Sequence, residues 1–488
     1  MGHLRQTVFE RNVPARSVVD HALSTTRQAV FWQDDLGDSP ALPALSAPVR
    51  VDVAVVGAGF AGLWTALRAR QRDPGARVVL IEGRTAGWSA SGRGVGFCGT
   101  RLAHDGGADA EERATLARVG HENLAAMGAA VAELGLDCQW ERAGVVDLAV
   151  EPHQIDWLQD AAAAAARAGV PHTLLDRAKL RAEIASPTYE AGLVRPDDVA
   201  LVHPARLAAG LVRAAVELGV EIFEQTRVTR LTPPGRGTGG DVVLHTTSPA
   251  GEAEVRADRV VLGTGAFPPL LRRYRRHTVP VYGYAVATEP LPADLLGAVG
   301  WRGRQGLTDL ANQAHRYRLT ADDRIVFGGY DAVHPYGGRL RRAHENRPGN
   351  SRRLAEHLLT TFPQLEGVRL SHRWAVVADT PTRPGPLFGQ AVGGRVQHVA
   401  GFGGTGAAAA HFAAHVVLDR FGVLDGGPPT ERTTLGAVWR VPAPYPPEPV
   451  ASAGLRAVRR ALDRADHRSG RRDALLRSLD ALGLGRDL

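Results

Sequence analysis

The sequence contains few of the residue types that mark several common protein classes. Its 488 residues include only two cysteines, Cys98 and Cys138, and one lysine, Lys179, among 58 basic residues. Two cysteines cannot form a disulfide framework or a four-cysteine metal site. No stretch reaches the roughly 18 uninterrupted apolar residues of a membrane span, the longest candidate being the alanine run 161–166, and the first residues lack a secretory signal pattern. We therefore expect a cytoplasmic protein with no metal site and no membrane partner.

Length and composition indicate a globular protein of more than one domain. Hydrophobic residues make up 44% of the chain and charged residues 22%, as in ordinary folded proteins. The chain is about three times the usual domain length, so we expect two or three interleaved domains.

The net charge of +7 is unevenly distributed, because residues 452–488 hold nine arginines against five aspartates. This tail has no aromatic ring except His467, whereas sites for single-stranded nucleic acid interleave basic residues with stacking aromatics. The tail therefore indicates helices with a solvated basic face rather than a nucleic-acid partner.

Two apolar runs on either side of a glycine-rich turn predict a strand–helix–strand unit. Residues 51–56 have the continuous apolar character of a buried parallel strand, and a helical pattern follows the turn as far as Asp73. Residues 78–81 form the second expected strand, and a third strand–helix junction is expected over 396–421. This rhythm predicts an α/β fold with a Rossmann-like domain.

A different pattern, strict alternation, appears between these pieces. Tyr282, Tyr284 and Val286 share one face of an extended run, and residues 315–319 repeat the pattern. Alternation of this kind is typical of an antiparallel sheet with one covered face. We therefore expect a substrate domain with an antiparallel sheet, inserted into the Rossmann-like domain.

The expected domain boundaries follow from these patterns and from the prolines between 442 and 449. They are an N-terminal extension (1–48), a discontinuous dinucleotide-binding domain (49–105, 200–275 and 370–425), a substrate domain (106–199 and 276–369), and a proline-rich linker with a helical tail (426–488).

The first glycine-rich turn has the spacing of a dinucleotide site. Gly57 permits the tight turn, Gly59 lets the backbone approach a pyrophosphate, and Gly62 lets the helix and strand pack closely. The start of the helix faces the phosphates with unpaired N–H groups. Glu82, at the end of the second strand, can accept hydrogen bonds from ribose hydroxyls. This motif predicts a dinucleotide and leaves NAD and FAD open.

A second loop of small residues, Gly87-Trp-Ser-Ala-Ser-Gly-Arg-Gly-Val-Gly96, follows Glu82 directly. A flavin, whose ribityl chain and ring extend beyond the pyrophosphate, needs such backbone donors there. At this point the chain resembles the D-amino-acid oxidase-like family of FAD-dependent oxidoreductases, most of all its γ-glutamylputrescine oxidase-like branch. The resemblance spans nearly the whole chain and includes residues 31–32, 57–62, 90–93, 203–207, 263–266, 317–319, 328–331 and 401–406.

The resemblance implies a set of FAD-binding residues and a non-covalent FAD. It implies contacts to the pyrophosphate and ribose, to the ribityl chain and ring, to the adenine, and to the pyrimidine edge of the flavin. The expected residues are Gly57, Gly59, Phe60, Ala61, Gly62, Glu82, Gly83, Arg84, Ser89, Ala90, Ser91, Arg93, Val228, Gly265, Gly403, Gly404, Thr405 and Gly406.

The last glycine loop has an independent physical reason to face the flavin. A helix that starts after Gly406 directs N–H groups and a positive dipole end at the negative charge of reduced flavin. A second NAD site there would lack the following strand and its acidic residue. Two features depart from the family pattern: Gly94 replaces an asparagine, and residues 375–384 replace a glycine-rich stretch.

Catalytic residues are expected on the strands that cover the flavin. His315, Tyr317, Tyr284 and Tyr330 alternate onto one face of those strands, although a packed ring with a satisfied polar atom explains each of them equally well. Arg316 and Arg318 would then point the other way. For Cys98, a small buried thiol is favoured over covalent attachment of the flavin.

These observations predict oxidation of a C–N bond of a small amine or amino acid to an imine, with O2 or another acceptor reoxidising the flavin. Oxidation of an alcohol carbon is the first alternative, and a nucleic-acid-binding or assembly role for the basic tail is the second. Several oxidases of the family use a lysine beside the flavin. Lys179 lies in a charged helical pattern, and Phe327 stands where that lysine would be expected. The sequence predicts no particular amine and no oligomeric state.

Overall fold

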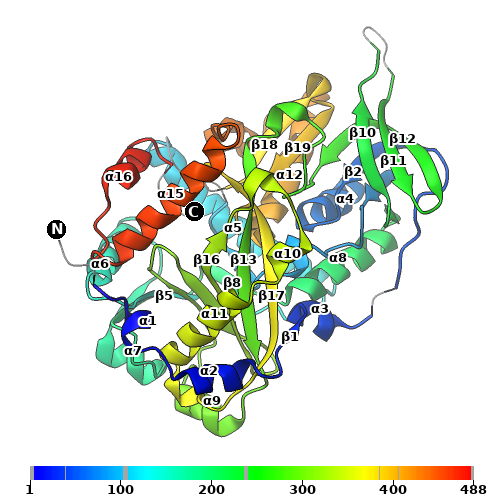
Figure 1. Ribbon diagram of the computed structural model, residues 1–488. Helices are drawn as coiled ribbons and strands as arrows, with labels where there is room; N and C mark the ends of the chain where they lie inside the picture. The colour runs from blue at the N-terminus through cyan, green and yellow to red at the C-terminus, as the bar shows by residue number, and fades with distance from the viewer. Residues whose placement is uncertain are drawn as a thin grey trace.

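Two mixed β-sheets with helices packed against them make up the computed structural model (Figure 1). It describes residues 5–38, 40–102, 108–235, 240–383, 385–404 and 406–484. The architecture confirms the predicted fold class, a Rossmann-like α/β unit combined with a largely antiparallel sheet.

The Rossmann-like sheet is built around the predicted strand–helix–strand unit. Its strands are β10 (Arg227–Thr232), β11 (Val242–Ser248), β12 (Gly251–Leu262), β2 (Val49–Val56), β3 (Val78–Ile81) and β9 (Glu221–Phe223) in spatial order, with β19 (Val396–Ala400) paired to β12 and β18 (Leu387–Ala391). The pairings of β2 with β3, β3 with β9, and β12 with both β2 and β19 are parallel. The apolar residues of β3 and those at the carboxyl ends of β2 and β12 are buried on both faces, as parallel strands require.

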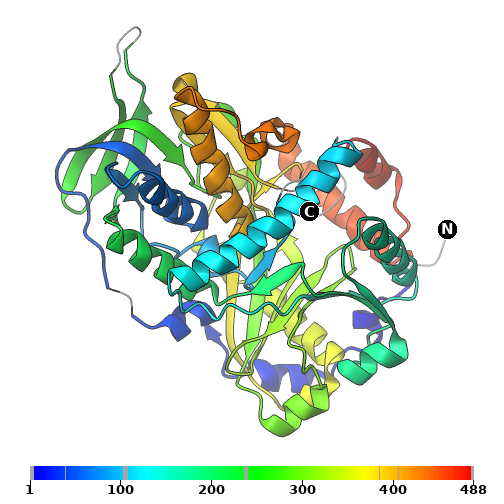
Figure 2. The ribbon, with the colours of Figure 1, turned by 180° about the vertical axis from the view of Figure 1, so that it is seen from behind.

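Helices cover this sheet and form the largest apolar core. They are α4 (Phe60–Arg72), α5 (Ala110–Glu133), α8 (Pro204–Glu217) and α12 (Gly406–Leu424), with α12 packed against α4 and α5 (Figure 2). The small two-stranded sheet of β4 (Phe97–Gly99) and β8 (Val199–Leu201) lies against α12 and α5.

The second sheet has nine strands. Their spatial order is β1 (Arg27–Gln28), β17 (Leu370–Pro381), β13 (Thr278–Thr288), β16 (Ile325–Val333), β15 (His315–Leu319), β14 (Gly306–Asp309), β5 (Val145–Ala149), β7 (Ala191–Arg195) and β6 (Thr173–Asp176). All its pairings are antiparallel except β1 with β17 and β14 with β5. One face packs on α11 (Pro348–Thr361), which itself lies on α2 (Arg16–Leu23).

The remaining helices lie around this sheet and at the two ends of the chain. They are α1 (Val8–Arg11), α3 (Phe31–Leu36), α6 (Gln154–Arg167), α7 (Arg177–Glu183), α9 (Ala293–Val299), α10 (Arg342–Glu345), α13 (Glu431–Thr434), α14 (Gly436–Trp439), α15 (Val450–Asp466) and α16 (Ala474–Ala481), with single 3-10 turns at Ala90–Gly92, Arg272–Tyr274, Tyr336–Gly338, Pro363–Leu365 and Val392–Gly394.

Two features differ from the sequence-based expectation. The boundary expected at residue 370 assigns β17 to the dinucleotide-binding part, but β17 pairs along the whole of β13 in the nine-stranded sheet, because its apolar residues complete that core. The helix with the length and apolar character closest to a membrane span is α12 rather than the alanine run, since its window includes buried valine, leucine and phenylalanine. That window is 78% buried inside the protein, as expected of a core helix.

Candidate functional site

A large cavity extends from the glycine-rich turn after β2 to the face of the nine-stranded sheet opposite α11. Its volume is about 2130 Å³, and residues from both sheets line it. Sites for small ligands usually occupy ~300–1,000 Å³. The cavity therefore has room for an extended cofactor together with a substrate.

Glycine is required at the dinucleotide end of this cavity for steric reasons. Gly57 has φ +100°, and a Cβ there would lie 2.5 Å from the carbonyl oxygen of Gly263. A Cβ on Gly62 would lie 1.8 Å from the carbonyl oxygen of Gly57, so α4 and β2 pack with no space for a side chain. Gly57, Gly59, Phe60 and Ala61 line the cavity, whereas Gly62 supports the turn from behind. This geometry fits a pyrophosphate at the start of α4.

Glu82 lies at the end of β3 with its carboxylate directed back at the turn. Oε2 accepts a hydrogen bond from the backbone N–H of Ala58 at 2.8 Å, and Oε1 accepts one from Arg84 at 2.9 Å. Burial raises the pKa of this carboxyl, and the two backbone donors oppose the shift. Each carboxylate oxygen keeps a further lone pair. Glu82 lines the cavity and can accept a hydroxyl there.

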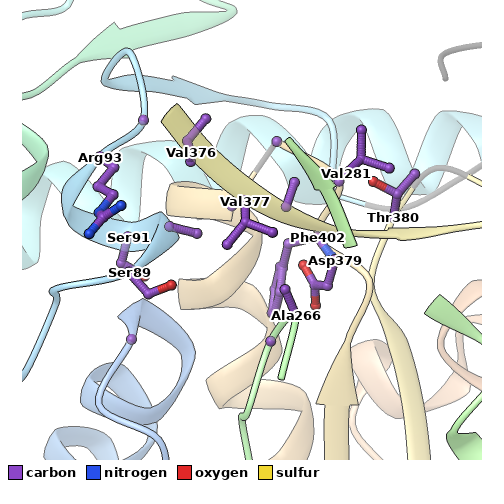
Figure 3. A pocket seen from close by; sticks show the side chains of 18 of the residues that line it. Ser89, Ser91, Arg93, Ala266, Val281, Val376, Val377, Asp379, Thr380 and Phe402 are labelled. Carbon is purple, nitrogen blue, oxygen red and sulfur yellow. Dashed lines mark hydrogen bonds between the residues drawn. The ribbon is translucent and has the colours of Figure 1, made fainter. Parts of the chain in front are cut away.

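The second loop of small residues folds over the start of α4. Ser91 Oγ accepts a hydrogen bond from the backbone N–H of Phe60 at 2.9 Å, which caps the helix. Arg93 donates to the Trp88 carbonyl at 2.8 Å and pairs with Glu345 at 3.1 Å, so its guanidinium is held in the cavity wall. Ser89, Ser91 and Arg93 lie on the left of the close-up in Figure 3, and Val377 of β17 and Phe402 of the glycine loop that precedes α12 lie toward its centre.

Asp379 of β17 organises that glycine loop. Its Oδ2 accepts a hydrogen bond from the N–H of Gly401 at 2.6 Å, and its Oδ1 accepts one from Phe402 at 3.2 Å. Burial raises the pKa of the Asp379 carboxyl to about 6. Within the described part of the chain, no basic side chain forms an ion pair with it. A buried carboxyl without a cationic partner in a cavity wall is typical of a functional group. Figure 3 shows Asp379 beside Phe402 and Ala266.

Most of the predicted cofactor residues line the same cavity. Besides those named above, the cavity-lining members are Gly83, Arg84, Ser89, Ala90, Ser91, Arg93, Val228, Gly265, Gly403, Gly404 and Gly406. Thr405 lies outside the described residues. The structure thus brings together groups that are more than 300 positions apart in the sequence.

The four predicted catalytic side chains share the face of the nine-stranded sheet that packs on α11, because Tyr284 and His315 are both paired with Gly329. Tyr284 borders the cavity, but its ring is buried in the same core as Tyr317, where its hydroxyl donates to the carbonyl of His344 at 2.7 Å. The other three, His315, Tyr317 and Tyr330, do not line it. Tyr317 is packed in the core that contains α11 and bonds the hydroxyl of Tyr189 at 2.9 Å.

His315 belongs to a buried chain of polar groups behind the sheet. Its Nδ1 lies 2.6 Å from an Asp309 carboxylate oxygen, and its Nε2 lies 2.9 Å from Nδ1 of His357. Burial lowers the pKa of His357 to about 2. The Tyr330 ring stacks on His315 at 5.2 Å. These contacts are those of a packed core, so the structure does not support a direct catalytic role for His315, Tyr317 or Tyr330.

The side chains of β15 alternate as expected, but the face that meets the cavity is the one opposite to the expected face. Arg316 lines the cavity, and a Cβ on Gly404 would lie 3.9 Å from its Nη1. Arg318, in contrast, is buried and donates to the carbonyl of Val202 at 2.7 Å. Burial lowers the pKa of Arg318 to about 10. An alternating pattern specifies which residues share a face and not what covers that face.

Three further residues considered from the sequence, Cys98, Lys179 and Phe327, do not line the cavity. Cys98 is fully buried in the core with α5 and α12, and burial raises the pKa of its thiol. Lys179 is exposed on α7, and Phe327 is buried against Tyr317. No metal-like cluster of histidine, cysteine and carboxylate side chains occurs among the described residues.

Sequence reasoning missed four side chains of the cavity wall as functional candidates. Asp379 lies inside the segment 375–384, whose departure from the family pattern was the available signal, and Arg316 had been placed on the opposite face. Leu462 and Arg472 come from the C-terminal tail, where nothing in the local sequence indicates proximity to a site.

Comparisons with known proteins agree with this geometry. A family model described as FAD dependent oxidoreductase matches residues 52–420. The chain is 27% identical over 403 residues to the Haemophilus influenzae protein named probable oxidoreductase OrdL, covering 80% of this chain and 87% of that protein. It is 28% identical over 392 residues to gamma-glutamylputrescine oxidoreductase of Escherichia coli, covering 77% and 84%.

Solved structures show the same fold at lower identity. Glycine oxidase from Geobacillus kaustophilus superposes with a TM-score of 0.65 at 20% identity, covering 80% of this chain and 99% of that one. L-proline dehydrogenase from P. horikoshii gives 0.64 at 16% identity, covering 80% and 97%.

Proposed function

Because this chain belongs to the family of FAD-dependent oxidoreductases, we propose that it oxidises a C–N bond of a small amine or amino acid to an imine. Two kinds of observation support the proposal. The relatives include a gamma-glutamylputrescine oxidoreductase, and the cavity has room for a substrate beside the cofactor. The observation that carries the reaction type is Asp379, a buried carboxyl without an ion-pair partner among the described residues, at the loop that precedes α12.

The residues present fit FAD, which supplies a two-electron acceptor when it is bound. The start of α4 would hold the pyrophosphate, Glu82 the adenosine ribose and Val228 the adenine side. Ser89, Ser91 and Arg93 would adjoin the ribityl chain and ring, with Gly403 and Gly404 opposite. We propose that FAD is held without a covalent bond, since the nearby thiol, Cys98, faces the core instead of the cavity.

The substrate-facing residues have separate tasks. An amine must lose its ammonium proton before its C–N bond can be oxidised, and the Asp379 carboxylate can accept that proton because its pKa is about 6. Arg316 lines the wall of the same cavity and would orient the substrate. The apolar side chains Val281, Val376 and Val377 of β13 and β17 line another part of the wall and limit the access of water (Figure 3).

Anaerobic mixing with amines tests the proposal. The purified protein should be yellow, and acid precipitation should release all of its flavin as FAD into the supernatant. A panel of amines, amino acids and polyamines should include compounds that bleach the flavin absorbance in the absence of O2. Bleaching by alcohols alone would overturn the C–N assignment, and flavin that stays in the pellet would overturn non-covalent binding. Admission of O2 then shows whether it restores the absorbance.

A further inference from the structure

The part of the chain beyond the family match folds back onto the cavity. The match ends at residue 420, yet Leu462 of α15 and Arg472, between α15 and α16, both line the cavity. Figures 1 and 2 show α15 and α16 side by side against the flank of the molecule remote from β10 and β11. Residues 450–484 lie outside the region that the family model matches.

Specific polar contacts hold this C-terminal segment in place. Oδ1 of Asp466 accepts hydrogen bonds from the backbone N–H of Asn312 at 3.0 Å and from its Nδ2 at 2.7 Å. Nη1 of Arg472 donates to Oδ1 of the same Asn312 at 3.4 Å. Arg459 pairs with Asp331 at 3.1 Å. Asn312 lies between β14 and β15 and itself lines the cavity, so the C-terminal segment is hydrogen-bonded to a loop of the site.

The loop that contains Asn312 leads directly to the end of the cavity where the flavin is proposed to bind. Asn312 precedes Arg316 by four residues, and the Arg316 guanidinium lies close to Gly404, as described above. Arg472, Asn312, Arg316 and Gly404 all line the cavity, with Arg472 bonded to Asn312 and Arg316 close to Gly404. A substrate whose reacting carbon lies near the glycine loop would extend along these residues toward Arg472.

The charge of the cavity wall indicates what such a substrate carries. Asp147 and Asp198 are paired with Arg195 at 2.6 and 2.9 Å, and Asp309 is bonded to His315. Among the described lining residues there are five carboxylates, Glu82, Asp147, Asp198, Asp309 and Asp379, and twelve arginines, Arg84, Arg93, Arg101, Arg195, Arg227, Arg230, Arg272, Arg275, Arg316, Arg339, Arg341 and Arg472. The pyrophosphate of one FAD offsets only part of this excess. A cleft lined mainly by cations concentrates anions.

We propose that residues 450–484 complete the substrate site and that Arg472 binds a carboxylate of the substrate at the end remote from the reacting C–N bond. The inference rests on the proposed function and adds to it a C-terminal segment of the site and a residue that determines specificity, Arg472. Asp480 pairs with Arg472 at 2.6 Å, and both side chains are about 30% exposed. Because an ion pair exposed to solvent is weak, Asp480 can orient the guanidinium and still allow a substrate carboxylate to bind it. Leu462 of α15 lines the same cavity.

Calorimetric titration of the FAD-loaded protein with two inert probes tests the assignment. Glutarate carries two carboxylates, and glutaramide has the same length without charge. The wild-type protein should bind glutarate more tightly. Arg472→Gln should weaken glutarate by about tenfold, equivalent to ~1.4 kcal/mol, and change glutaramide by less than about twofold. Arg472→Lys should retain most of the preference, and Arg477→Gln, an exposed arginine of α16 that does not line the cavity, should change neither affinity.

Two results would overturn the proposal. One is a glutarate affinity that is the same in Arg472→Gln and the wild type, or undetectable in both. The other is an equal loss for both probes, which would mean that the segment only supports the fold. FAD content and melting temperature of each variant identify a folding defect, in which case Arg472→Lys decides. Because the titration needs no turnover, a failure of all amines to reduce the flavin would overturn the proposed function without affecting this result.

Discussion

The two ends of the cavity are built in different ways. The dinucleotide end consists of contiguous motifs, with β2, the glycine turn, α4 and Glu82 all within residues 49–82. The substrate end combines β13, β15, β17, the loop before α12 and the C-terminal segment, which are separated by up to about two hundred positions. Local motifs thus specify cofactor binding, and long-range packing specifies the substrate. Substitutions at the two ends should have separable effects, on FAD affinity and on turnover respectively.

The largest effect is expected from Gly62→Ala. The new Cβ would lie 1.8 Å from a backbone oxygen that cannot move without opening the turn, so the variant should be purified without FAD. Gly297→Ala in α9 is the matched control, because a Cβ there has open space. Flavin absorbance per protein and far-UV circular dichroism measure the outcome. Normal FAD content in Gly62→Ala would contradict the close packing of α4 on β2.

Asp379→Asn should affect the opposite end. If Asp379 accepts the amine proton, the rate of flavin reduction should fall by about a hundredfold or more while FAD remains bound. In the wild type the carboxylate form is the active one, so the rate should fall as the pH drops through about 6 and level off above it. The variant should lack this step. Stopped-flow reduction between pH 5 and 8 gives both quantities, and an unchanged rate would remove Asp379 from the proposed mechanism.

The Glu82→Gln substitution tests the dinucleotide end of the cavity. Hydrogen bonds to charged groups contribute ~1.5–3 kcal/mol each, so FAD affinity should fall at least about tenfold. The protein that retains FAD should be reduced at a near-normal rate, because Glu82 lies at the dinucleotide end. Glu221→Gln is the control in the same sheet, since Glu221 pairs with the half-exposed Arg77 at 2.7 Å instead of lining the cavity. Equal FAD affinity in both variants would mean that Glu82 does not contact the ribose.

A smaller effect is expected from Tyr317→Phe. The change removes a buried hydrogen bond to Tyr189 and should cost ~1 kcal/mol of unfolding free energy, with flavin reduction unchanged within about twofold. Tyr284→Phe, which removes a buried hydrogen bond to the His344 carbonyl in the same core, should behave in the same way. Urea denaturation and stopped-flow reduction separate the two effects. A large loss of rate in Tyr317→Phe alone would restore the catalytic role that its position argues against.

The smallest effect is expected from Lys179→Met. Lys179 is the only lysine, and it is exposed on α7 outside the cavity lining. The rate at which O2 restores the flavin absorbance should therefore change by less than about twofold. That is well below the tenfold that corresponds to ~1.4 kcal/mol of lost stabilisation. Stopped-flow mixing with oxygenated buffer measures it, and a tenfold loss would place a lysine in the oxygen reaction.

The sequence alone determined the α/β fold class, the FAD-binding family and the residues of the dinucleotide end. This was possible because turn, helix start and acidic residue lie within about thirty positions, and because steric and dipole requirements restrict the residues that such a turn accepts. The strand patterns over 51–56, 78–81 and 396–400 were equally local, since a buried parallel strand is apolar along its whole length.

Only the tertiary structure decided which face of β15 and β16 meets the cavity. Alternation places His315 and Tyr317 on one face and Arg316 on the other, but it does not say which face is covered by which layer. The tertiary structure shows that α11 covers the first face and that the cavity lies on the second. The structure also placed Asp379 at the loop before α12 and docked Asp466 on Asn312. Contacts over such separations depend on packing between distant elements, for which a local pattern contains no information.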